Sequence, residues 1–278
     1  MGFNDGLEGE GFDRPFYLPA EQNDFMQCLC RQHPWVVAIL TAGGGVEIPW
    51  IDQVEALLYS WYPGQAGDKA LANLLLGKNN PSGKLPISIE KRWRDNAAFG
   101  SYDTTFAQPG AEPLYTLYGK PHTIEHIPYR EGIFTGYRHY DTHQISPLFP
   151  FGYGLSYSRF TLSCPRISQS ELTSGDTLYI RVKIKNTGKC EGQETVQLYL
   201  EDVDSSLPRP LHELKAFQKI NLKAGESKYV SFQLTEKDFA FYNPTHSQWE
   251  TEAGHFIIHI GTSSRQLPLQ KSFYLKPH

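Results

Sequence analysis

The chain has 278 residues, of which 40% are hydrophobic and 20% charged, enough to bury the core of one large domain or of two ordinary ones. Its 26 basic and 30 acidic residues leave a net charge of −4, which excludes the electrostatic footprint of a nucleic-acid-binding protein or of one that binds an anionic membrane. No apolar run approaches the roughly 18 residues of a membrane span, and no signal peptide opens the sequence.

The opening stretch Glu8-Gly-Glu10-Gly-Phe-Asp13-Arg14 places two carboxylates among glycines, directly ahead of an acid–base pair. A carboxylic acid on a loop suits the cleavage of glycosidic bonds, because a poor alkoxide leaving group has to be protonated as it departs. Short Glu/Gly segments are, however, more often solvated turns. The residues by themselves favour the turn and leave the catalytic interpretation open.

The next hundred residues alternate between strand and helix patterns. Apolar residues at helical spacing, with Phe25 on the expected buried face, predict a helix over 20–32, and residues 35–40 form an apolar run typical of a strand covered on both faces. A second apolar run follows at 56–61, and another helical pattern at 66–76 ends at a glycine. This order predicts an α/β layer with parallel strands.

Two glycine-containing segments resemble nucleotide-binding loops but lack the required spacing. Gly43-Gly44-Gly45 does not fit Gly-x-Gly-x-x-Gly, and residues 77–84 place the glycines one residue too far apart for a phosphate loop. We interpret the first as a tight turn and the second as a turn that leads into a short strand, Ile87 to Ile89.

Residues 91–157 lose clear periodicity and are rich in Pro, Gly, Tyr and His. They contain two histidine pairs spaced four apart, His122 with His126 and His139 with His143. On a helix this spacing would suit a metal, but prolines bracket the first pair, and we expect exposed loop histidines without a metal or cofactor.

Beyond residue 160 the pattern changes to alternation of apolar and polar residues. Alternating strands are expected at 178–184, 196–200, 229–234 and 256–260, with turns such as Asn186-Thr-Gly188 between them. Short strands at this spacing predict an antiparallel β-sandwich. The expected segments are therefore 1–100 as part of an α/β domain, 101–157 as an aromatic-rich connection, and 158–278 as the sandwich.

The four cysteines are Cys28, Cys30, Cys164 and Cys190. The first two lie too close together for an easy disulfide, and no second pair has zinc-ligand spacing. Buried or idle thiols are expected, and the cellular compartment stays open, with a periplasmic or secreted location as one alternative.

The chain resembles the carboxyl-terminal portion of glycoside hydrolase family 3, the β-glucosidase and β-xylosidase group. The blocks that carry this resemblance run through the whole chain in the family's order. They are Glu10-Gly-Phe-Asp13-Arg14, Leu18-Pro19, Gly44-Gly45-Val46-Glu47, Pro49-Trp50, Trp61-Tyr-Pro-Gly-Gln65, Asn80-Pro-Ser-Gly-Lys-Leu-Pro86, Tyr129-Arg-Glu-Gly-Ile-Phe-Thr-Gly-Tyr-Arg138-His-Tyr-Asp141, Phe149-Pro-Phe-Gly-Tyr-Gly-Leu-Ser-Tyr157, Asn186-Thr-Gly188 and Glu213-Leu-Lys-Ala-Phe217.

The resemblance implies a partial α/β sandwich domain followed by a fibronectin-III-like β-sandwich. It also implies that Glu10 is the general acid/base, with Glu8 as the competing assignment, while Asp13 and Arg14 form an internal ion pair or loop brace. The family's aspartate nucleophile lies on a (β/α)8 barrel, for which this sequence has no matching motif. By resemblance, the complete enzyme acts on a β-linked oligosaccharide or an aryl glycoside.

Two function hypotheses follow from these observations. The first is a fragment of a retaining β-glycosidase that is inactive without the barrel. The second is a non-catalytic carbohydrate- or partner-binding module that uses the aromatics between Tyr102 and Tyr157, although aromatics in such segments more often pack inside a domain seam. Exposed sheet surface along Val36 to Leu40 is also expected to promote oligomerisation.

Overall fold

The computed structural model describes residues 1–3, 6, 8–9, 14–101 and 129–277. The chain forms two compact units. Unit 1 comprises residues 1–76, 88–135 and 146–149, and unit 2 comprises 77–87, 136–145 and 150–278. The chain therefore passes between the units several times, and residues 77–87 and 136–145 belong with the sandwich although they precede it in sequence.

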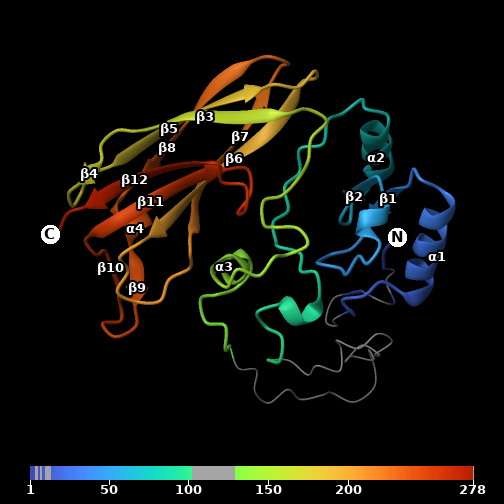
Figure 1. Cartoon of the computed structure of the whole chain (residues 1–278), viewed down its shortest axis with the longest axis horizontal. Helices are drawn as coiled ribbons and strands as arrows, with labels where there is room; N and C mark the ends of the chain where they lie inside the picture. Colours follow the sequence, from blue (N-terminus) through green and yellow to red (C-terminus); the bar gives the residue numbers. More distant parts are fainter. Residues whose placement is uncertain (4–5, 7, 10–13, 102–128, 278) are drawn as a thin grey trace. The chain divides into compact units, whose positions relative to one another are not determined.

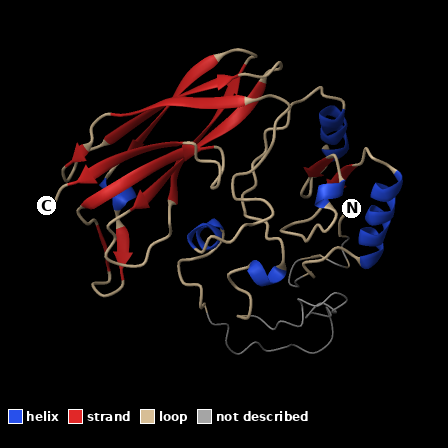
Figure 2. Cartoon of the chain, viewed as in Figure 1, coloured by secondary structure: helices blue, strands red, loops and turns tan. Residues whose placement is uncertain are grey.

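Unit 1 is a small α/β unit, as predicted. Its strands β1 (Val37–Leu40) and β2 (Ala56–Tyr59) pair in parallel, with Val37 opposite Ala56 and Leu40 opposite Tyr59 (Figures 1 and 2). The remaining elements are α1 (Ala20–Gln32), η1 (Ile51–Gln53), α2 (Gly67–Leu75) and η2 (Trp93–Asp95). Gly77 adopts φ +68° directly after α2, the left-handed conformation that commonly ends a helix.

The buried face of α1 differs from the predicted one. Met26 is its buried residue, and Leu29 and Cys30 pack against the same core, whereas Phe25 is 58% exposed.

The strand prediction over 35–40 was also wrong in one respect. Alternate residues Val36, Ala38 and Leu40 are buried, but Val37 is 52% exposed, so β1 is not covered on both faces.

Unit 2 is a β-sandwich of a five-stranded sheet packed on a three-stranded one. The five-stranded sheet is antiparallel except for one short edge strand, which pairs in parallel. The order is β4-β12-β11-β6-β7 in the first sheet and β3-β5-β8 in the second. The strands are β3 (Phe160–Ile167), β4 (Glu171–Leu172), β5 (Leu178–Asn186), β6 (Gly192–Asp202), β7 (Glu213–Leu222), β8 (Ser227–Leu234), β11 (Gly254–Gly261) and β12 (Leu269–Leu275). A helical turn, α4 (Glu236–Phe239), and the hairpin β9 (Phe241–Asn243) and β10 (Gln248–Glu250) follow β8 (Figure 1).

Alternation accounts for the sandwich core. In β5 every second residue, from Leu178 to Ile184, is buried, and these side chains join those of β6, β8 and β11 in one cluster. The central strand β6 is buried on both faces, which places Gln197 and Tyr199 on the face away from that cluster. Gln197 donates to the carbonyl oxygens of Gly152 and Thr262, so the segment that begins at Pro150 covers this second face.

The segment Asn80-Pro-Ser-Gly-Lys-Leu-Pro86 is a strap on the sandwich. Asn80 donates to the Glu191 carbonyl and accepts a hydrogen bond from Ser156. Lys84 forms a 2.7 Å ion pair with Glu194 at the start of β6. The predicted strand over 87–89 was wrong, since Ile89 makes only an isolated antiparallel bridge with Phe149.

All four cysteines are free; three of them are exposed and Cys30 is half-buried, so of the expected buried or idle thiols the exposed three are not buried. In the part of the chain that the structure describes, no helix is long and apolar enough to cross a bilayer.

Asp202, at the end of β6, is a buried carboxyl whose contacts only partly offset the free-energy cost of removing its charge from water. Its side chain is 6% exposed, and its ion pair with Arg209 is long, at 3.6 Å. Burial raises the pKa of Asp202 to about 6, with Glu252 and Asp204 adding to the effect and Arg209 opposing it. Above that pH the ionised carboxylate therefore destabilises the sandwich.

We expect Asp202→Asn to stabilise the chain at pH 7.5. The pKa of Asp202 in the folded state lies above its ordinary value of 3.8, so the native state loses stability as pH rises from about 4 to 6, and the amide removes this loss. Thermal unfolding should show a gain on the order of 1–2 kcal/mol at pH 7.5 that disappears below about pH 4.

Asp204→Asn is the matched control. Hydrogen bonds from His255 hold the pKa of Asp204 below its usual range, so this substitution should lower stability at neutral pH. The same sign for both variants would contradict the account given for Asp202.

Candidate active-site loop

Three loops meet at one edge of the parallel sheet of unit 1. Residues 1–3 run parallel to β1, through a bridge between Gly2 and Thr41 and hydrogen bonds between Met1 and Ile39 and between Thr41 and Met1. The opening loop follows residues 1–3, the glycine turn follows β1, and the Trp61-Tyr62 turn follows β2. Because carboxyl ends of parallel strands share an edge, these loops are brought together, and this edge is where open α/β sheets bind ligands.

Glu8 is the residue on which the three loops converge. Its carboxylate forms a 2.9 Å ion pair with Arg14 Nε and accepts hydrogen bonds from the Gly43 amide and the Tyr62 hydroxyl. The Glu8 and Arg14 side chains are 17% and 10% exposed. A carboxylate so far removed from water requires this set of donors.

Arg14 ties the opening loop to the glycine turn. One guanidinium nitrogen donates to the Gly45 carbonyl at 2.7 Å and another to the Pro15 carbonyl at 3.1 Å. Its carbon Cζ lies 4.6 Å from the centre of the Phe3 ring, a cation–π contact. The loop-brace interpretation of Arg14 is thus retained with Glu8 as the partner, while Asp13 lies outside the described residues.

The turn after β1 consists of glycines because side chains of other loops lie very close to its backbone. A Cβ on Gly43 would lie 2.7 Å from Glu8 Oε1 and 3.1 Å from Tyr62 Cε2, and a Cβ on Gly44 would lie 3.3 Å from an Arg14 nitrogen. The Tyr59 hydroxyl donates to the Gly44 carbonyl. The predicted tight turn is therefore a surface against which the opening loop packs.

The pKa values follow from these contacts. Burial alone would raise the pKa of Glu8, but the Tyr62 hydroxyl, the Arg14 guanidinium and the Gly43 amide together lower it below its usual value. Burial raises the pKa of Tyr59 to about 12, so Tyr59 stays neutral and acts as a hydrogen-bond donor. Glu8 is therefore a carboxylate at neutral pH.

Of the two predicted site residues, Glu8 is described and Glu10 lies outside the described residues. Sequence reasoning did not single out Tyr62 as a partner of Glu8. A signal was present, since Pro63-Gly64 marks a turn directly after a predicted parallel strand, where loops from neighbouring strands meet.

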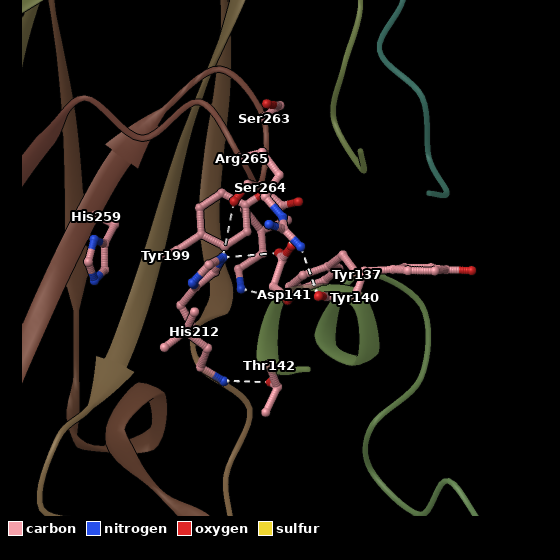
Figure 3. Close-up of polar contacts among 12 residues, drawn as sticks. Tyr137, Tyr140, Asp141, Thr142, Tyr199, His212, His259, Ser263, Ser264 and Arg265 are labelled. Atoms are coloured by element: carbon pink, nitrogen blue, oxygen red, sulfur yellow. Dashed lines mark hydrogen bonds and ion pairs between the residues drawn. The ribbon is translucent and has the colours of Figure 1, made fainter. Parts of the chain in front are cut away.

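A second polar cluster lies in unit 2 around Asp141, on α3 (Tyr137–Thr142) (Figure 3). Asp141 is buried and paired with Arg265 Nε, and its Oδ2 lies 3.2 Å from His212 Nε2. Arg265 also donates to the carbonyls of Tyr140 and Ile145, at 2.8 Å each. We call these three residues, Asp141, His212 and Arg265, the carboxylate hub.

The carboxylate hub is an anchor and not a nucleophile site. His212 Nε2 also lies 3.2 Å from the Ser264 carbonyl oxygen, and because both neighbours are acceptors this nitrogen must carry the hydrogen. His212 therefore does not act as a base toward the Ser264 hydroxyl.

Tyr137 stacks on Phe151 at 4.9 Å and meets Tyr199 edge to face, so these aromatics of the connecting segment pack inside unit 2.

Of the second histidine pair, His139 lies on a helix and is half-buried, which corrects the prediction of an exposed loop histidine, while His143 is exposed just beyond the helix. His139 is on α3 and His143 caps it, with ring centres 4.9 Å apart. Within the described residues no group of three metal-ligating side chains occurs. His122 and His126 lie outside the described residues.

Comparisons with known proteins cover almost the whole chain. A family model for the glycosyl hydrolase family 3 C-terminal domain matches residues 1–157, and one for a fibronectin type III-like domain matches 194–264. Thermostable β-glucosidase B of Acetivibrio thermocellus is 40% identical over 98% of this chain and 34% of its own length. β-Glucosidase BoGH3A of Bacteroides ovatus is 38% identical over 93% of this chain and 33% of its own.

Solved structures give the same result. The family 3 β-glucosidase of Bifidobacterium adolescentis superposes with a TM-score of 0.86 at 34% identity, over 99% of this chain and 38% of that one. The Kluyveromyces marxianus β-glucosidase in complex with glucose gives 0.87 at 34% identity, over 100% of this chain and 31% of that one. The chain thus spans about a third of the length of the curated relatives it matches.

Removing the anion of the carboxylate hub should destabilise unit 2. Asp141→Ala leaves the partly buried Arg265 and the buried His212 without the carboxylate that lies between them, and we expect a loss of about 3–5 kcal/mol in the free energy of unfolding, measured with urea.

The contrasting variant is Glu171→Ala, which breaks an ion pair with Lys276 whose two side chains are largely solvent-exposed. It should leave the urea midpoint almost unchanged, because exposed pairs contribute little. Equal effects of the two substitutions would contradict an anchoring role for Asp141.

Proposed function

The chain belongs to glycoside hydrolase family 3, and we propose that it supplies the general acid/base of a retaining β-glycosidase of the β-glucosidase type. The observation that carries this proposal is the loop of Glu8, which sits at the carboxyl edge of the parallel strands in a chain matched almost end to end by β-glucosidases. The proposed substrates are sugars at the non-reducing end of a β-linked oligosaccharide or of an aryl β-glucoside.

The proposed chemistry requires two carboxyl groups about 5 Å apart. An aspartate on the family's barrel attacks the anomeric carbon while the acid on the opening loop gives its proton to the departing oxygen. The resulting loop carboxylate then takes a proton from water as that water attacks the glycosyl–enzyme intermediate. In this division of labour the chain by itself hydrolyses nothing, because it supplies one carboxyl group of the pair.

We assign the acid/base to Glu10, and the contacts of Glu8 support this choice. A general acid must hold a proton at working pH, which enzymes achieve by raising the pKa of the carboxyl. The pKa of Glu8 is lowered instead, and all its described partners are donors that favour the carboxylate. Glu8 then serves as the anion that braces the loop, and it remains the alternative acid/base.

A fusion enzyme tests the assignment. This chain would replace the aligned carboxyl-terminal third of the Acetivibrio thermocellus enzyme, and hydrolysis of aryl β-glucosides would be compared with that of the chain alone. The fusion should be active and the chain inactive. Glu10→Gln should lower kcat about 10²- to 10⁴-fold for poor leaving groups and much less for activated ones, with rescue by azide.

Glu8→Gln is the matched variant in the same fusion. It should lower activity without azide rescue, because a brace is not replaced by an external nucleophile. Rescue of Glu8→Gln but not of Glu10→Gln would transfer the acid/base role to Glu8. Robust turnover by the chain alone, or a folded but inactive fusion, would contradict the proposed function.

We also propose that the chain associates with itself or with a partner through unit 1. Trp35 is 77% exposed and Val37 52% exposed beside the β1 strand, and Leu76 is 69% exposed after α2. Such apolar surface favours association. Sedimentation of the purified chain should show concentration-dependent species above monomer mass, reduced in the double variant Trp35→Gln, Val37→Thr. A clean monomer at all concentrations would contradict this.

A further inference from the structure

Trp61 is held in a strained backbone conformation immediately beyond β2. It adopts φ +52°, which is uncommon and unfavourable for a bulky residue that is not glycine. Its ring packs 4.9 Å from that of Tyr59, the last residue of β2. Strain of this kind persists where the surrounding structure requires it, and it is often found near functional sites.

The residue that follows this strained position, Tyr62, contacts two of the three converging loops. Its hydroxyl donates to Glu8 Oε2, and its ring carbon Cε2 would lie 3.1 Å from a Cβ at Gly43. Tyr62 is nevertheless 55% exposed, so burial of apolar area is not the main reason for its placement. The turn that contains the strained Trp61 places the Tyr62 hydroxyl beside the Glu8 carboxylate.

The ion pair between Glu8 and Arg14 joins residues six positions apart, so it ties together the two ends of the opening loop. The Gly43 amide and the Tyr62 hydroxyl hold the Glu8 end to the rest of unit 1. Among the described residues, the charged and titratable groups that lower the pKa of Glu8 are Tyr62 and Arg14, and Tyr59 interacts electrostatically with both Arg14 and Glu8.

We propose that Tyr62 is a positioning residue of the opening loop: its hydroxyl holds Glu8 as an anion between Arg14 and the Gly43 amide, and this contact sets the geometry of the loop for catalysis. The inference rests on the proposed function, because the loop is there assigned the acid/base. Tyr62 itself touches no reacting atom in this role. Its effect is on alignment, which a shift of about 1 Å can abolish.

The direct test uses the full chain and the variant Tyr62→Phe. Loss of the hydroxyl removes a donor to the carboxylate, so the titration of Glu8, followed by carbon NMR of its carboxyl group, should move to higher pH. Exchange of the Gly43 amide hydrogen should become roughly fivefold faster, the loss of about one hydrogen bond. Tyr179→Phe, an equally exposed tyrosine on β5 in unit 2, is the control and should change neither.

The catalytic readout uses the fusion enzyme described above. Tyr62→Phe should lower kcat about tenfold with KM within about twofold, and should move the acid limb of the pH–rate profile upward, because Glu8 must be ionised for the loop to be aligned. Azide should not rescue this variant. Tyr62→Leu should reproduce the shift, which shows that the hydroxyl and not the ring is responsible.

The proposal is overturned if Tyr62→Phe leaves the Glu8 titration and the Gly43 amide exchange unchanged in the full chain. It is equally overturned if both change but kcat and the acid limb do not. Failure of the proposed function looks different: the unmodified fusion would be inactive, while the effects on Glu8 and Gly43 in the chain alone would still occur.

Discussion

The carboxylate of Glu8 is the interaction on which the candidate site depends. It has lost most of its contact with water, and an ion in that position is tolerated only where charged and hydrogen-bonding partners replace the solvent. Those partners come from three separate places: Arg14 from the opening loop, the Gly43 amide from the turn after β1, and Tyr62 from the turn after β2. The parallel sheet makes this convergence possible, because it delivers the ends of neighbouring strands to one edge.

Unit 2 also contains a buried carboxylate held by charged and hydrogen-bonding partners, and there it attaches one segment of the chain to another. Asp141 lies on a short helix far ahead of the sandwich in sequence, and its pairing with Arg265 and His212 attaches that helix to the loop that follows β11 and to the start of β7 (Figure 3). The attachment is required because β6 is buried on both faces. Gln197 faces away from the sandwich core and donates to the Gly152 carbonyl of the covering segment, while the Tyr199 hydroxyl donates to Gln197.

Periodicity predicted the elements that are locally encoded. The helix over 20–32 was predicted with its observed ends, because Pro19 and Pro34 border an amphipathic stretch, and the parallel pairing of β1 with β2 followed from alternating strand and helix patterns. The periodicity predicted the wrong buried face for α1 and predicted that both faces of β1 are covered, whereas Phe25 and Val37 are exposed. Whether an apolar residue is covered depends on neighbours that are distant in sequence, which a local pattern does not contain.

By itself, the sequence determined the two fold types, the order of the elements and membership of the family, because these depend on composition, alternation and motifs along the chain. It also singled out the opening stretch as the candidate site. The tertiary structure alone decided that Arg14 pairs with Glu8, that Tyr62 completes that group, and that Asp141 meets Arg265, 124 residues further along. The physical reason is that a charged side chain with little access to water pairs with the groups that lie beside it in space. The sheet and the sandwich bring those groups together only when the chain is folded.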